Sequence, residues 1–198
     1  MSFYPQGYEP KDPPSDYMRL QPGENRIRIL ANPIIGYETW IDEDNKRKPI
    51  RYKDFNKAVA DPRADKIKEF HAFIVWDYAS QDVQLLSLTQ KTIQKAIFNH
   101  ATDPDWGDPT RYDIIISKSG KGLETEYNVK MKPSKPMDEA ITDAFKQVKI
   151  ETEEYFNNGH PIVRTKDENG VSDEDALIDT TSDQTISFWY EWKEAKNH

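Results

Sequence analysis

Two stretches of alternating side chains, joined by a glycine-containing turn, constrain the fold more than any other feature of the chain. Tyr112, Ile114 and Ile116 alternate with the residues between them, and alternation resumes over residues 123–131 after the turn at residues 119–122. Successive side chains of a strand point to opposite faces of a sheet, whereas an apolar helix face needs a spacing of three or four residues. The pattern therefore predicts an antiparallel hairpin with one face directed at a core.

The preceding part of the chain adds three predicted strands and one predicted helix. The strands are expected at residues 24–41, with bends at Asn32-Pro33 and Gly36, at residues 70–78 and at residues 83–88, and the helix at residues 89–100, capped by Thr89. The order β-β-β-α-β-β is that of the OB-fold, a five-stranded Greek-key barrel. Apolar residues at helical spacing over residues 137–156 predict an additional C-terminal helix, so the expected class is mainly β with helices.

Composition narrows the class of protein. The chain has 198 residues, enough for one main domain with extensions, and 12% aromatic residues, which is far from a disordered composition. Its mean hydropathy is -0.90. The absence of cysteine excludes disulfides and thiolate metal sites. Because there is no long apolar run, we expect a soluble, intracellular protein without a membrane span.

Charge is distributed unevenly, and this distribution predicts the domain organisation. The net charge is -8, yet residues 1–135 hold 21 Lys and Arg against 20 Asp and Glu, whereas residues 136–198 hold 6 against 15. We therefore expect four regions: an N-terminal arm at residues 1–23, an OB-fold core at residues 24–135 that includes a basic loop at residues 42–66, a packing helix at residues 136–158, and an acidic C-terminal region at residues 159–198.

The basic loop carries the main functional signal. Residues 46–57 contain six cations, one acid and two aromatic residues. Cations neutralise phosphates and aromatic rings stack on unpaired bases, so this combination is typical of a single-strand binding groove. The alternative is an ordinary solvated loop, since most charge runs have no further role. In an OB-fold this segment would be the first loop, which borders the oligonucleotide-binding face.

Further candidate ligands lie on the predicted strands. In the strand at residues 70–78 both faces carry an aromatic side chain, so we expect one ring to remain exposed for stacking, on a face that the sequence does not identify. Cations flanking the fourth strand are candidate phosphate contacts, with turn solubility as the alternative. The complete predicted DNA-binding set is Tyr37, Trp40, Lys46, Arg47, Lys48, Arg51, Tyr52, Lys53, Phe55, Lys57, Phe73, Trp76, Arg111, Lys118 and Lys121.

Motifs of catalysis and metal binding are missing from the sequence. There is no nucleophile elbow, Walker phosphate loop or dinucleotide fingerprint. Asp103, Asp105 and Asp108 resemble the start of a calcium loop, but Ile114 stands where the bidentate Glu is needed. The four histidines have no ligand spacing. We therefore expect no enzyme activity, no metal and no cofactor.

Five stretches together resemble bacteriophage single-stranded DNA-binding proteins, namely residues 20–30, 73–78, 84–93, 105–109 and 112–129. The resemblance covers residues 17–135 and is most specific over residues 112–129. It implies an OB-fold core, coating of single-stranded DNA with little sequence preference during replication, recombination or repair, and location in the host cytoplasm. It also implies an acidic C-terminal region that binds replication or recombination proteins, and self-association on DNA is an open possibility. An OB-fold module that binds another replication protein is the alternative function.

Two differences separate the chain from that family. Some relatives carry a zinc-binding subdomain, which this chain cannot build without cysteine. Acidic tails of the family run to the terminus, whereas here the run of acids ends near Asp183 and the chain closes with Trp192-Lys-Glu-Ala-Lys-Asn-His. A tail that occupies the basic loop until DNA displaces it, or that binds a polymerase or recombinase, is what the resemblance implies.

Overall fold

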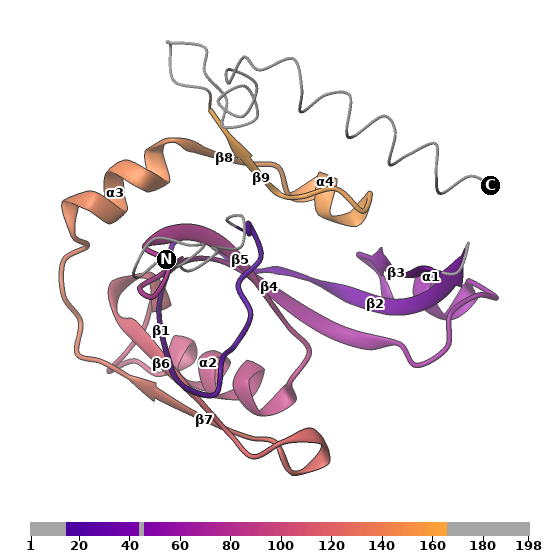
Figure 1. Cartoon of the computed structure of the whole chain (residues 1–198), viewed down its shortest axis with the longest axis horizontal. Helices are drawn as coiled ribbons and strands as arrows, with labels where there is room; N and C mark the ends of the chain where they lie inside the picture. The colour runs from indigo at the N-terminus through magenta and orange to yellow at the C-terminus, as the bar shows by residue number, and fades with distance from the viewer. Residues whose placement is uncertain (1–14, 44–45, 166–198) are drawn as a thin grey trace, which may run out of the picture. The chain divides into compact units, whose positions relative to one another are not determined.

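The computed structural model describes residues 15–43 and 46–165, which form a mainly β protein with four α-helices (Figure 1). The strands are β1 (Gly23–Ile29), β2 (Ile34–Glu43), β3 (Lys46–Tyr52), β4 (Lys68–Asp77), β5 (Asp82–Leu88), β6 (Asp113–Ser119), β7 (Glu126–Met131), β8 (Val148–Ile150) and β9 (Ile162–Arg164). The helices are α1 (Phe55–Ala60), α2 (Lys91–Thr102), α3 (Glu139–Lys146) and α4 (Thr152–Phe156), with 3-10 turns η1 (Pro109–Arg111) and η2 (Gly122–Glu124).

The chain divides into two units, residues 1–163 and residues 164–198. Only Arg164 and Thr165 of the second unit are described, so residues 166–198 of the acidic region predicted at residues 159–198 lie outside the described residues. The first 14 residues of the predicted arm lie outside them as well. In the described part of the chain, no helix is long and apolar enough to cross a membrane.

Strand β4 organises a seven-stranded antiparallel sheet. The order is β3-β2-β4-β1-β6-β7, and β5 pairs with β4 outside this path. One edge of β4 pairs with β5, while the other pairs with β2 through residues 68–72 and with β1 through residues 75–77. The predicted hairpins of β4 with β5 and of β6 with β7 are both confirmed.

β1 and β2 follow one another along the same edge of β4, as expected for a long bent strand. The bend occupies residues 30–33 and includes the predicted Asn32-Pro33. The Leu30 amide still donates to the Ile74 carbonyl at 2.9 Å, which links the two halves of the ladder. Gly36 is not a second bend. It lies within β2, where a Cβ atom would approach the Tyr52 carbonyl oxygen to 2.6 Å.

One face of β4 lies against the helix α2. Phe73 and Val75 pack there with Ile27 and Ile29 of β1 and with Ile93 of α2. Helix α2 begins at Lys91 with Gln90 as its N-cap residue and without a side-chain cap, so the predicted cap at Thr89 is wrong. The apolar stripe of the helix, which includes Ile93 and Ile97 at helical spacing, is buried.

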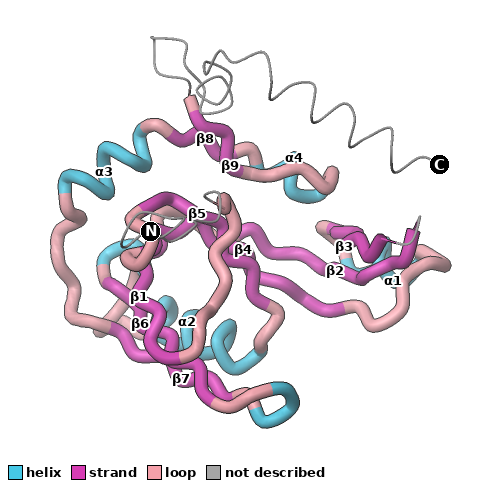
Figure 2. The backbone as a smooth tube through the Cα atoms, viewed as in Figure 1, coloured by secondary structure: helices cyan, strands magenta, loops and turns pink. Residues whose placement is uncertain are grey.

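The other face of β4 is covered by a C-terminal layer, defined here as residues 137–163. Phe70, Ile74 and Trp76 pack there with Ile141 of α3 and Tyr155 of α4. A loop leads from β7 to this layer (Figure 2). The single packing helix predicted at residues 136–158 is wrong in form, because β8 separates α3 from α4 and pairs with β9. The predicted packing against the rest of the domain is confirmed.

The described end of the N-terminal arm is packed, although a loose arm was predicted. Tyr17 forms a parallel bridge with Leu85 of β5. The Met18 amide donates to the Leu85 carbonyl at 2.9 Å, and the Met18 side chain is buried in the core. The arm therefore covers the edge of β5 that β4 leaves free, which removes an exposed strand edge.

A buried charge network joins β1 to β6. Asp113 lies directly opposite Arg28, and both side chains are 1% exposed. The Asp113 carboxylate accepts hydrogen bonds from Arg28 Nε at 2.6 Å, from Tyr78 Oη at 3.0 Å and from Arg26. Burial alone would raise the pKa of Asp113, but the hydrogen bonds from Arg26 and Arg28 outweigh it and hold the pKa below its ordinary value.

Candidate nucleic-acid interface

The basic segment was predicted to be a loop, and this prediction is wrong. It forms the strand β3 followed by the helix α1. β3 is the edge strand of the sheet and pairs with β2 from Tyr37↔Tyr52 to Glu43↔Lys46. An edge strand tolerates Pro49, and backbone pairing needs no apolar alternation, so cations can occupy both faces. Asp54 caps α1 by accepting a hydrogen bond from the Asn56 amide at 2.7 Å. We call residues 34–60 the basic hairpin.

One face of the basic hairpin presents an exposed tryptophan beside an arginine. Trp40 is 45% exposed, and its indole Nε1 donates to Glu38 at 3.4 Å. The guanidinium of Arg47 lies over the Trp40 ring, 5.7 Å from its centre. Lys46 and Lys48 flank Arg47 in β3, so their exposed side chains extend from the opposite face, where Lys48 pairs with Glu43 at 3.1 Å. A stacking surface and several cations therefore meet at the outer end of the hairpin.

The opposite face carries rings that contact α1. The rings of Tyr37 and Phe55 meet edge to face, with their centres 5.2 Å apart, and Phe55 is 49% exposed. Tyr52 donates its hydroxyl hydrogen to Asp61 at 2.7 Å. Burial of the ring is the main cause, and the hydrogen bond to Asp61 the second, that raises the pKa of Tyr52 to about 12. Lys57 is exposed on α1.

Two predicted phosphate contacts are held by the C-terminal layer instead. The Arg51 guanidinium lies 3.9 Å from the centre of the Tyr155 ring and donates to the Tyr155 carbonyl at 3.4 Å, and its side chain is 9% exposed. Lys53 pairs with Glu153 and lies 5.3 Å from the centre of the Phe156 ring. Arg51 is therefore a packing residue. Its partners are about 100 residues away in the chain, which is why the local sequence pattern did not reveal them.

Neither predicted ring of the second strand is exposed. Phe73 is 3% exposed on the α2 side of β4, and Trp76 is 8% exposed beneath the C-terminal layer. The expectation that one face of this strand leaves a ring open for stacking is wrong. A strand at the centre of a two-sided core buries both faces, and the sequence pattern did not reveal that residues 137–163 supply the second cover.

Three predicted cations lie away from the basic hairpin. Lys118 and Lys121 belong to the β6–β7 turn region, which is separate from the β2–β3 hairpin (Figure 1). Lys118 Nζ donates to the Leu20 carbonyl at 3.0 Å, so it fixes the arm. Arg111 is exposed in η1. The structure does not unite these residues with Trp40.

Arg63 is a candidate ligand that sequence reasoning missed. It is 60% exposed and pairs with Asp61 at 2.7 Å, which lowers the pKa of Asp61 together with the Tyr52 hydrogen bond. Arg63, Asp65 and Trp40 line one polar hollow of about 410 Å³ at the outer end of β2. The excess of cations over residues 46–68 was the signal that could have drawn attention to Arg63.

Metal binding has no geometric basis in the described ranges, where no group of three His, Asp or Glu side chains is arranged to hold an ion. Comparison with models of protein families, with curated proteins and with solved structures finds no match. The case for a function therefore rests on the geometry of the basic hairpin.

Proposed function

We propose that the protein binds single-stranded DNA through the basic hairpin, without enzymatic activity. The observation that carries the proposal is the exposed Trp40 ring with Arg47 over it, at the end of the hairpin where Lys46 and Lys48 extend from the other face of the same strand. In a chain of net charge -8, this is a local concentration of exposed cations around a stacking surface. Phosphates would pair with the cations while a base stacks on the ring.

The free protein already holds a cation where a base would stack. Arg47 lies over the Trp40 face as a cation–π contact, which is worth about 0.5–1 kcal/mol at an exposed site. Stacking of a base is worth about 1–3 kcal/mol. A base can therefore displace the guanidinium, which then becomes free to pair with a phosphate. Because no base edge is read in this step, sequence preference at Trp40 is weak.

The proposed fold is an OB-fold barrel. In this assignment β1 and β2 are the bent first strand, β4 and β5 the second and third, α2 the helix, and β6 and β7 the fourth and fifth. The antiparallel pairs β1–β4, β4–β5, β1–β6 and β6–β7 support it. No β5–β7 pairing occurs among the described residues, so the barrel would be partly open. The basic hairpin would then elaborate the first loop.

The broader role that we propose is coating of single-stranded DNA during phage replication, recombination or repair, in the host cytoplasm. Support comes from the resemblance of residues 17–135 to phage single-stranded DNA-binding proteins. Replication or recombination proteins are the proposed partners of the acidic region, and self-association on DNA is a further proposal.

A second candidate is a protein-interaction module. The C-terminal layer favours it, because Ile141, Tyr155 and Ile162 cover the β4 face that an OB-fold ordinarily offers to oligonucleotides. The two candidates differ in salt dependence. Binding of DNA through phosphates weakens steeply with salt, whereas binding of a protein partner through apolar surface does not.

The test compares two double variants in a fluorescence titration with oligo-dT over a salt series. In Lys46→Ala/Arg47→Ala the slope of log K against log salt falls by about 1.4 in magnitude, at about 0.7 for each lost phosphate contact. The matched control is Lys146→Ala/Lys149→Ala, which removes two exposed cations from the C-terminal layer and leaves the slope unchanged. Arg51 is left intact because it packs against Tyr155. An unchanged slope in the hairpin variant contradicts the proposal.

A further inference from the structure

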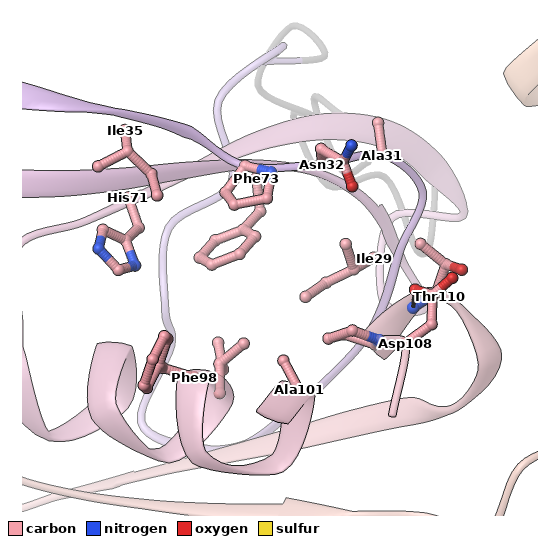
Figure 3. A pocket seen from close by; sticks show the side chains of 13 residues that line it. Ile29, Ala31, Asn32, Ile35, His71, Phe73, Phe98, Ala101, Asp108 and Thr110 are labelled. Carbon is pink, nitrogen blue, oxygen red and sulfur yellow. Dashed lines mark hydrogen bonds between the residues drawn. The ribbon is translucent and has the colours of Figure 1, made fainter. Parts of the chain in front are cut away.

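An apolar cavity of about 210 Å³ lies between the β1–β2 bend, β4 and α2. Figure 3 shows His71 and Phe73 reaching into it from the sheet and Phe98 and Ala101 from the helix. Pockets for drug-sized ligands measure roughly 300–1,000 Å³. The smaller volume suits a single ring system rather than a large cofactor or a folded element.

The mouth of the cavity exposes large apolar side chains. Phe98 is 61% exposed and Ile35 is 49% exposed, although both border the same hollow. Single exposed apolar residues are ordinary, but these two lie together at the rim of an apolar cavity, the arrangement in which ligand pockets are usually found. Ile97, their neighbour on α2, is 4% exposed, so the helix itself is firmly docked.

The chemistry of the lining favours an uncharged planar ligand. Phe73 and Phe98 supply aromatic rings, and burial lowers the pKa of His71, which is therefore neutral at pH 7. Asp108 is the one charged side chain that borders the cavity within the described residues, and no Lys or Arg lines it. Asn32 and Thr110 add hydrogen-bonding groups at the opposite end (Figure 3). A phosphate would be repelled, whereas the edge of a base would find donors and acceptors.

The cavity lies on the same side of the sheet as the face of the basic hairpin that carries Tyr37. Ile35 and Tyr37 lie on the same face of β2, about 7 Å apart as alternate residues of a strand are, and Tyr37 contacts Phe55. On α2, Lys95 is exposed one turn before Phe98 and forms no ion pair among the described residues. Rings and a cation therefore connect the hairpin with the cavity mouth.

We propose that this cavity takes one unstacked nucleobase of the single strand held by the basic hairpin. The inference rests on the proposed function and adds a second, separate base site to it. Phe98 would stack on the inserted base and Phe73 would close the far side, while Lys95 would meet the adjacent phosphate. An apolar side chain of a protein partner is the competing occupant, and the test distinguishes the two.

The experiment fills or opens the cavity in the full chain. Ala101→Phe fills it, and Asn99→Phe places the same ring on the exposed side of α2 as a matched control. Phe98→Ala opens it and costs little burial, since Phe98 is mostly exposed. The probe is a fluorescein-labelled 30-nucleotide oligo-dA at fixed salt, and thermal melting verifies the fold of each variant. Phe98→Ala and Ala101→Phe are expected to weaken binding by at least about fivefold, as loss of one stacking contact requires.

The salt slope separates this inference from the proposed function. Losing the base contact lowers affinity at every salt concentration and changes the slope by no more than about 0.7, the share of the single phosphate at Lys95, whereas loss of Lys46 and Arg47 changes it by about 1.4. If the wild-type protein binds the oligonucleotide and Phe98→Ala and Ala101→Phe bind it equally well, the base site is refuted and the cavity is left to a protein side chain, while the hairpin proposal stands. The base site is also refuted if Ala101→Phe and Asn99→Phe lose oligonucleotide affinity equally while Phe98→Ala keeps its affinity. If the wild-type protein binds no oligonucleotide, the proposed function itself fails.

Discussion

Replacing Asp113 by asparagine tests whether the buried charge network holds β1 to β6. The carboxylate is 1% exposed and accepts hydrogen bonds from Arg28 and Arg26 and from Tyr78. Asparagine keeps the volume but removes the negative charge, so the buried Arg28 guanidinium loses its counter-charge. Removing one partner of a buried pair costs about 3–5 kcal/mol. For a chain of this size that loss lowers Tm by about 6–20 °C.

The assay is urea unfolding followed by tryptophan fluorescence, for which the buried Trp76 is a core probe. Glu43→Gln is the control, because it also neutralises a carboxylate paired with a cation, but Glu43 and Lys48 are each about half exposed, at 54% and 48%. An exposed pair contributes about 0–1 kcal/mol. A similar small loss in both variants would refute the structural role of Asp113.

The same network predicts a pH dependence. The folded-state pKa of Asp113 is lowered, so its contribution to stability is complete above the ordinary carboxyl pKa and is lost as the pH falls through the folded-state value. The wild-type protein should therefore lose stability below about pH 4 more steeply than Asp113→Asn, which has no carboxyl group to protonate. Parallel pH profiles would contradict this assignment.

Two further perturbations test the packing around the basic hairpin. Gly36→Ala should cost about 1–3 kcal/mol in urea unfolding, because the added Cβ would lie 2.6 Å from the Tyr52 carbonyl oxygen and 2.8 Å from Phe156 Cε1; a neutral result would show that α4 does not press on β2. Tyr52 should ionise near pH 12 in an ultraviolet titration, and since its folded-state pKa is raised, the stability it contributes is present below about pH 10 and is lost as the pH rises toward 12. Tyr52→Phe should remove that titration step, and persistence of the step would assign it to another tyrosine.

The elements that the sequence predicted best are those whose side chains face one core and one solvent-exposed surface. In β7 the burial alternates residue by residue, as the pattern had indicated, and the β6–β7 turn lies at the predicted glycines. The bend at Asn32-Pro33 was also predictable, because proline cannot donate to the ladder. β3 was missed because its sequence shows no alternation of apolar and polar residues. Its pairing with β2 is made by backbone atoms, and its cationic side chains carry no apolar period.

The candidate site was predictable only where it is local in sequence. Trp40, Arg47, Lys46 and Lys48 were all named as candidate ligands from the sequence, and all four are exposed. The pairing of β2 with β3, which brings Arg47 to Trp40, was not predicted, because the basic segment was taken for a loop. Trp76 and Arg51 were assigned wrongly, since the residues that bury them belong to the C-terminal layer. Local pattern does not encode which distant segment covers a strand. The sequence around an aromatic residue on a strand is therefore the same whether the ring faces solvent or packs against Tyr155.

The C-terminal layer also explains why the proposed contacts with DNA lie where they do. Once Ile141 and Tyr155 cover one face of β4 and α2 covers the other, this central strand has no ring left to offer a base. Stacking must then use side chains that extend beyond the two-sided core, and the described exposed rings at its margins include Trp40, Phe55 and Phe98. Two of these belong to the basic hairpin and the third borders the apolar cavity. The layer thus stabilises the sheet and, by the same contacts, moves the available stacking surfaces from the centre of the sheet to its periphery.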